Sequence, residues 1–175
     1  NSNYTIIFTL HTTTAKGFEV AFHSGTIQIY TDTGSWRDTG YAPTAGVYEH
    51  IAFVRNYSGN TLKMYVNGEE KYSVSNNVDY SDNFDYVQIG SYDASAYGYF
   101  EGYISNFRIL NGTALYTTNY FSPPTSELKA IPNTILLCCQ DSDDPTKEET
   151  GKTITAAGGH FQTGSKNILK NGNFA

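Results

Sequence analysis

The chain has 175 residues, a length that suits one domain with a substantial hydrophobic core. Aromatic residues make up 15% of it, with 15 tyrosines and 16 glycines against a single methionine, which is typical of all-β proteins. The formal net charge of −6 disfavours a nucleic-acid partner and an anionic membrane surface, and no apolar run is long enough to span a bilayer.

Alternating side chains predict strands in the first part of the chain. Residues 4–11 place Tyr4, Ile6, Phe8 and Leu10 on one face, because successive side chains of a strand point to opposite sides. Residues 18–23 and 26–31 predict a hairpin closed by Ser24-Gly25. Residues 32–46 are polar and predict a long loop, which carries the only tryptophan.

The middle of the chain predicts further short strands. Residues 47–56 and 62–66 predict two of them, and Asn67-Gly68 predicts a type I′ turn into a third strand at 70–74. After an acidic loop comes a short strand at 86–90. These turn signals about every 8–12 residues favour an all-β, two-sheet antiparallel jelly-roll β-sandwich.

Residues 99–112 are the longest run of strand-forming residues, and they end on the strong turn signal Asn111-Gly112. Large side chains on both faces predict a central strand, covered on both sides, around which the other strands are arranged. Gly102 predicts a close approach of another element to the backbone. The six side chains expected to be mostly buried are Phe8, Phe22, Phe53, Ile89, Phe100 and Ile104.

The last part of the chain predicts fewer elements. Residues 113–116 suggest one helical turn, 134–140 a buried strand and 152–156 a weaker last strand. Cys138 and Cys139 are adjacent, so in a strand they would point to opposite faces and act as small hydrophobic side chains. We expect one β-sandwich over residues 1–160, and a linker or the start of another module over residues 161–175.

The order of four segments resembles the concanavalin A-like, laminin G-like and pentraxin-like jelly-roll superfamily. These segments are EHIAFVR (49–55), LKMYVNG (62–68), VQIG (87–90) and FEGYISNFRI (100–109). The later segments GTALYT (112–117), FSPP (121–124) and LLCCQ (136–140) resemble the version of this module found in phage virion and tail-fibre proteins.

The resemblance implies a non-enzymatic module of a virus-particle appendage, such as a tail fibre or capsid decoration, that acts in assembly or in attachment to a host-surface glycan. Its partners would be other copies of itself, other virion proteins or a cell-surface glycan, and its location would be the virion or the extracellular space. The family's usual first strand, before Tyr4, is missing, so we expect another segment or subunit to cover the N-terminal edge. The alternatives are a secreted carbohydrate-binding lectin and, more remotely, a glycoside hydrolase.

Catalysis is not expected. Glycosidases of this fold carry the strand motif Glu-x-Asp-x-x-Glu, which supplies an acid and a nucleophile, and the sequence lacks it around Glu49 and Glu101. His50 has no recognisable Ser or Cys partner, so we expect a hydrogen-bonded structural histidine.

No cofactor is expected, although relatives of this fold bind Ca²⁺ through several oxygen ligands. The candidate clusters are Asp141, Asp143 and Asp144, and Asp79, Asp82, Asn83 and Asp85. Neither cluster has the spacing of a dedicated calcium loop, so we interpret both as solvated acidic loops.

A glycan or partner site is predicted from aromatic residues in two loops, because sugar rings stack on aromatic faces while polar groups bind their hydroxyls. The candidates are Trp36, Arg37, Asp38 and Tyr41 in one loop, and Tyr92, Asp93 and Tyr97 in the other. The alternative is that these rings pack against a neighbouring chain or cap the core, since Tyr and Trp are also enriched at protein interfaces.

Overall fold

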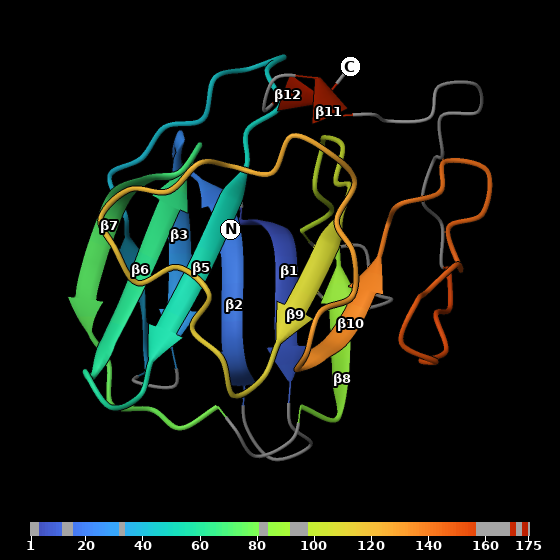
Figure 1. Ribbon diagram of the computed structural model, residues 1–175. Helices are drawn as coiled ribbons and strands as arrows, with labels where there is room; N and C mark the ends of the chain where they lie inside the picture. The colour runs from blue at the N-terminus through green and yellow to red at the C-terminus, as the bar shows by residue number, and fades with distance from the viewer. Residues whose placement is uncertain are drawn as a thin grey trace.

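A computed structural model of the chain describes residues 4–11, 16–31, 34–80, 84–91 and 98–156, together with two very short strands near the C-terminus. Every regular element in this described part is a β-strand, and all strand pairs are antiparallel. The strands lie in two facing layers (Figure 1). The predicted all-β antiparallel sandwich is therefore confirmed.

One layer is a five-stranded sheet in the order β4-β3-β2-β1-β8. Its strands are β1 (Thr5–His11), β2 (Lys16–His23), β3 (Thr26–Thr31), β4 (Ser35–Asp38) and β8 (Tyr86–Ile89). Because β1 pairs with both β2 and β8, the first strand lies inside the sheet. The expectation of an N-terminal edge in need of a cover is wrong: β4 and β8 form the two edges.

The facing layer holds a three-stranded sheet, β5-β6-β7, and a separate pair, β9-β10 (Figure 1). Its strands are β5 (Ile51–Asn56), β6 (Thr61–Val66), β7 (Glu69–Ser75), β9 (Phe107–Leu110) and β10 (Thr134–Cys138). Near the C-terminus, β11 (Leu169–Lys170) pairs with β12 (Asn173–Phe174).

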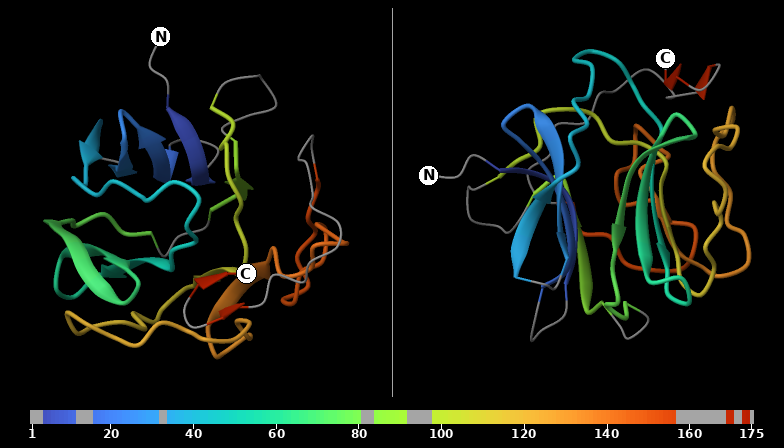
Figure 2. Two further views of the ribbon diagram at one scale, coloured as in Figure 1. Left: turned by 90° about the horizontal axis from the view of Figure 1, so that it is seen from above. Right: turned by 90° about the vertical axis from the view of Figure 1, so that its left-hand side faces the viewer.

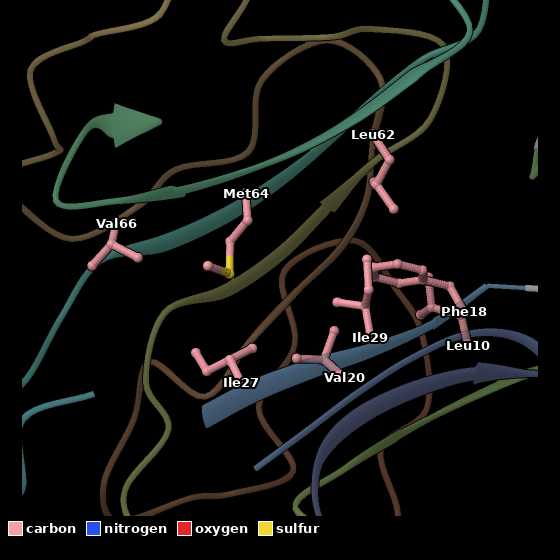
Figure 3. Close-up of a cluster of buried hydrophobic side chains, with 8 residues drawn as sticks. All are labelled: Leu10, Phe18, Val20, Ile27, Ile29, Leu62, Met64 and Val66. Carbon is pink, nitrogen blue, oxygen red and sulfur yellow. The ribbon is translucent and has the colours of Figure 1, made fainter. Parts of the chain in front are cut away.

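The core fills the space between the layers, with β6 on one side and β1 to β3 on the other (Figure 3). Its buried members are Leu10, Phe18, Val20, Ile27, Ile29, Leu62, Met64 and Val66. Phe8 adds edge-on contacts, with ring centroids 6.0 Å from Phe53 and 5.2 Å from Phe107. Burying such side chains stabilises the fold by about 2 kcal/mol each.

The segment between β9 and β10 crosses the outer face of β5-β6-β7 and forms a third layer (Figure 2). Its backbone is held where Glu70 N donates to Asn119 O over 3.1 Å and Phe121 N donates to Gly68 O over 2.9 Å. Asn67 and Gly68 have φ values of 50° and 84°, which confirms the predicted type I′ turn.

A β-bulge between Ile6 and Phe8 changes the predicted alternation in β1. Ile6 lies opposite Ala21, whereas Phe8 lies opposite Val20 in the core. Opposed residues share a face, so Ile6 is on the outer face of the sheet and Phe8 on the inner one. The prediction that Ile6 shares a face with Phe8 and Leu10 is therefore wrong.

The prediction of a long central strand at 99–112 is also wrong. Only Phe107–Leu110 is a strand, and it pairs with β10 alone. Asn106 has a φ of 53°, which an extended strand cannot accommodate. Gly102 is exposed, and the group close to its Cβ position is the ring of Phe100 at 2.6 Å rather than another element.

Other boundaries need correction. Residues 113–116 form no helical turn, and residues 152–156 form no strand. Among the described residues after β10, the β-pairing is a single isolated bridge between Cys138 and Glu148. Of the six side chains expected to be mostly buried, Phe22 is 36% exposed, because it lies at the end of the sandwich beside the Ser24-Gly25 turn. The other five are only partly exposed, as predicted.

The two cysteines do not point to opposite faces. β10 ends at Cys138, and Cys139 adopts a left-handed backbone with φ of 60°. The two sulfur atoms are therefore only 3.8 Å apart, and both thiols are free.

Candidate functional site

Trp36, Arg37 and Asp38 do not lie in a loop but form most of the edge strand β4. Trp36 pairs with Tyr30 and Asp38 with Gln28, so both point to the outer face of the five-stranded sheet. Arg37 pairs with the core residue Ile29 and points to the inner face. The structure therefore separates Arg37 from the other two.

Tyr41 does not join them either, because it packs against the core. Its hydroxyl donates a 2.6 Å hydrogen bond to Glu49 Oε1. Burial, followed by the hydrogen bond and negative charge of Glu49, raises the pKa of Tyr41. The other three predicted residues, Tyr92, Asp93 and Tyr97, lie outside the described residues.

Four rings gather on the outer face of β1 to β4, and we refer to Tyr4, His23, Tyr30 and Trp36 as the outer aromatic platform. The ring of Tyr4 stacks on His23 at 4.0 Å and on Trp36 at 4.5 Å. Tyr30 meets Trp36 edge-on at 5.7 Å. All four rings are partly exposed, so the platform combines a fixed shape with accessible aromatic surface.

Polar groups border the platform on the β4 side. Asp38 is exposed, and its pKa is lowered by hydrogen bonds from the Gly40 backbone and the Thr26 hydroxyl and by the nearby His23. Gly40 N lies 2.8 Å from Asp38 Oδ1. The Nδ1 atom of His23 is buried and has no hydrogen-bond partner among the described residues. The site therefore offers an ionised acceptor beside stacked rings.

The rest of this face, toward β1, is closed. Thr9, Glu19 and Ala21 are completely buried, and His11 stacks on Tyr86 with centroids 5.0 Å apart. Accessible surface on this face is thus found toward β4, around Trp36 and Asp38.

Sequence reasoning missed Tyr4, His23 and Tyr30 as parts of this site. Tyr4 and His23 are distant in the chain, and they meet because β1 pairs antiparallel with β2, while Trp36 lies two strands beyond β2. The alternation of side chains in β2 predicts that His23 points to the outer face. The bulge in β1, which sets the register of Tyr4 beside His23, cannot be predicted from the sequence.

His50 lies just before β5, under the segment that crosses the three-stranded sheet. Its ring meets Phe121 and Tyr116 edge-on at 5.7 Å and 6.2 Å, and Tyr116 stacks on Phe121 at 3.6 Å. Its backbone N donates to Asn67 Oδ1, but its ring Nδ1 has no hydrogen-bond partner among the described residues. Burial, with a smaller effect of the Arg108 charge, lowers the pKa of His50 to about 4. The expected structural role fits this packing, but of the hydrogen bonds expected for a structural histidine, none is made by Nδ1 within the described residues.

Three glutamates of the three-stranded sheet and its borders already have partners within the protein. Glu70 pairs with Lys63 at 2.7 Å and Glu69 with Lys71 at 2.8 Å, while Glu49 accepts from Tyr41. Glu101 is exposed.

The acidic loop after β10 binds its own backbone. Asp141 Oδ1 accepts from Asp143 N at 3.0 Å, and Asp144 Oδ1 accepts from Thr146 N at 2.9 Å. Of the other cluster, Asp79 and Asp85 are exposed, and the remaining two members, Asp82 and Asn83, lie outside the described residues. No group of three or more His, Cys, Asp or Glu side chains within the described ranges is placed to hold a metal ion.

These features define a two-layer antiparallel β-sandwich with an aromatic, acid-bordered surface on one sheet. A profile of the concanavalin A-like lectin/glucanases superfamily matches residues 1–116, and the chain belongs to this superfamily. Searches of curated proteins and of solved structures returned no match. No helix in the part of the chain that the structure describes is long and apolar enough to cross a membrane.

Proposed function

We propose that the chain is a non-catalytic, glycan-binding sandwich of a phage-particle appendage, such as a tail fibre or capsid decoration, and that it attaches to host-surface sugars through the outer aromatic platform. The observation that carries the binding proposal is the stack of Tyr4 on Trp36 beside the ionised Asp38. Membership of a superfamily of lectins and glucanases supports a carbohydrate ligand.

Binding would follow from two properties of the platform. The apolar face of a sugar ring stacks on the indole of Trp36, whose orientation is fixed by Tyr4 and Tyr30. Asp38 accepts hydrogen bonds from the sugar hydroxyls, and its ordering by Gly40 reduces the entropy lost on binding. An exposed surface of this kind suits an extended saccharide bound weakly and repeatedly, as in a multivalent particle.

The phage setting is supported by the resemblance of residues 112–117, 121–124 and 136–140 to virion modules. A secreted lectin would bind sugars through the same platform. The phage appendage and the secreted lectin would therefore have the same binding site and different partners. The absence of Glu-x-Asp-x-x-Glu from the sequence and the ion pairs of Glu69 and Glu70 support a non-catalytic role.

The test is a glycan array followed by titration calorimetry with the best glycan. Trp36→Ala is expected to weaken binding about tenfold, because an aromatic stacking contact contributes about 1–1.5 kcal/mol. Tyr120→Ala is the matched control, since Tyr120 is 65% exposed and lies on the segment that crosses the other sheet. Equal losses in the two variants, or no glycan bound by the unchanged chain, would contradict the proposal.

Assembly with further copies of the chain is a second candidate function. Val47 and Tyr103 are 50% and 55% exposed, and Tyr48 lies 6.2 Å from Tyr103. Aromatic residues are enriched in the buried centres of protein interfaces. Light scattering of the chain over a concentration series tests it: a Tyr103→Ser variant should lower the mass of any oligomer, and a monomer at every concentration would exclude self-assembly.

A further inference from the structure

The junction after β10 holds two adjacent thiols in an unusual arrangement. Adjacent residues in a strand direct their side chains to opposite faces, but the left-handed backbone of Cys139 brings its sulfur to within 3.8 Å of that of Cys138. Only a few per cent of residues other than glycine adopt such a conformation. Both thiols are free in this structure.

The surroundings hold this conformation from both sides. Asn106 N donates a 2.9 Å hydrogen bond to Cys139 O, and Asn106 itself has a left-handed φ of 53°. Gln140, the next residue, donates from Nε2 to Asn106 Oδ1 at 3.2 Å and to Leu128 O at 2.6 Å. On the other side, Leu137 O accepts from Glu149 N at 3.0 Å. The backbone around the two thiols is therefore fixed before any reaction.

We infer that Cys138 and Cys139 are a site of reversible oxidation, which closes them into a vicinal disulfide when a low-molecular-weight disulfide such as oxidised glutathione is present. The site consists of Cys139, a residue that is partly exposed, and of the buried Cys138, whose sulfur already lies 3.8 Å from that of Cys139.

The reaction takes place by two thiol–disulfide exchanges. The Cys139 thiolate attacks oxidised glutathione, forms a mixed disulfide and releases one glutathione thiolate. Cys138 then loses its proton and attacks the Cys139 sulfur, which releases the second glutathione. The protein loses two protons and two electrons, which together are two hydrogen atoms, and one oxidised glutathione becomes two reduced ones.

The pKa shifts of the two thiols also predict that Cys139 reacts before Cys138. The contact between the two sulfurs lowers the pKa of Cys139, while that same contact and burial raise the pKa of Cys138. The thiolate is the nucleophile in such exchanges, so Cys139 reacts first. Adjacent α-carbons are about 3.8 Å apart, which is shorter than the usual spacing across a disulfide, so the closed bond is readily reduced again.

The test uses the full chain, reduced and then incubated with oxidised glutathione, and read by intact mass and by peptide mapping. We expect a monomer that has lost two hydrogen atoms, carries no glutathione and regains both thiols with dithiothreitol. Cys138→Ser should instead keep a stable glutathione adduct at Cys139, because no second thiol can displace it. A lasting glutathione adduct on the unchanged chain, or two thiols that remain free, would overturn the inference.

A second measurement separates the folded site from adjacency alone. In a glutathione redox buffer, the equilibrium constant for closing the disulfide is expected to be about tenfold larger for the folded chain than for the chain in urea, because the fold already holds the left-handed Cys139. Equal constants in the two states would show that the structure does not prepare the pair, and would overturn the inference as well.

Discussion

Replacing Gly68 by alanine is expected to lower the free energy of unfolding by about 3 kcal/mol. An alanine Cβ at this position would lie 1.9 Å from Phe121 O, which is backbone and cannot move aside as a flexible side chain would. Gly68 also has a φ of 84°, which disfavours any residue with a Cβ. The substitution should detach the segment around Phe121 and uncover the stacked rings of Tyr116 and Phe121.

Gly46→Ala is the matched control for this prediction. Gly46 has a similar φ of 76°, but nothing lies within 4 Å of its Cβ position. The Gly46→Ala variant should therefore lose about 1 kcal/mol of unfolding free energy, which is the conformational cost of placing alanine at a positive φ. Urea unfolding of both variants measures the difference. If the two variants lose equal stability, the close packing of the crossing segment on Gly68 is not a stabilising contact.

The hairpins were predictable because their signals are local. Ser24-Gly25 and Asn67-Gly68 supply positive φ values directly at the turns, and the apolar alternation on either side sets which face is buried. The sandwich follows from these pairs, since each sheet must bury its apolar face against the other. The same local signals do not specify which strands meet at long range.

The errors arise where long-range contacts decide the local structure. Residues 32–46 predict a loop, yet four of them pair as strand β4, which is too short to show an alternating pattern. The Thr39 hydroxyl, directly after β4, donates to Ile27 O at 2.6 Å and holds this end of the strand against β3. The run at 99–112 has strong strand propensity throughout, yet Asn106 turns the chain toward Cys139 O and only the last part pairs. Propensity was overridden by tertiary contacts in both cases.

The candidate site shows the same division. Trp36 and Asp38 were identified from their chemistry alone, as an aromatic ring beside a carboxylate, and the structure keeps them on one face. Arg37 was misplaced because a strand, unlike a loop, sends adjacent residues to opposite faces. The ring that completes the stack, Tyr4, comes from the start of β1, three strands away from β4 in the sheet, and no spacing in the sequence indicates it.

The fold is expected to lose stability in mild acid because of His50. The ring lies between β5 and the crossing segment, packed edge-on against Phe121 and Tyr116. Protonation would place a charge in this apolar setting and near Arg108, which is why the pKa of His50 falls from 6.5 to about 4. In the unfolded chain the histidine is solvated and retains its ordinary pKa.

The sign follows from proton binding in the two states. Between the two pKa values the unfolded chain binds more protons than the folded chain, so the free energy of unfolding decreases as the pH falls through 6.5 toward 4. This group should contribute a loss of about 2.5 kcal/mol between about pH 7 and pH 4.5, and none above pH 7. Urea unfolding at a series of pH values measures it, and most carboxylates titrate below this window.

His50→Gln isolates the contribution of this residue. Glutamine is neutral at every pH in the window, so the difference in unfolding free energy between the original chain and the variant should change with pH by the same 2.5 kcal/mol or so. His23→Gln is the comparison, because His23 is on the opposite sheet beside the negative charge of Asp38. If the original chain and His50→Gln have parallel pH profiles, His50 is charged in the folded state, and the crossing segment does not exclude water from its ring.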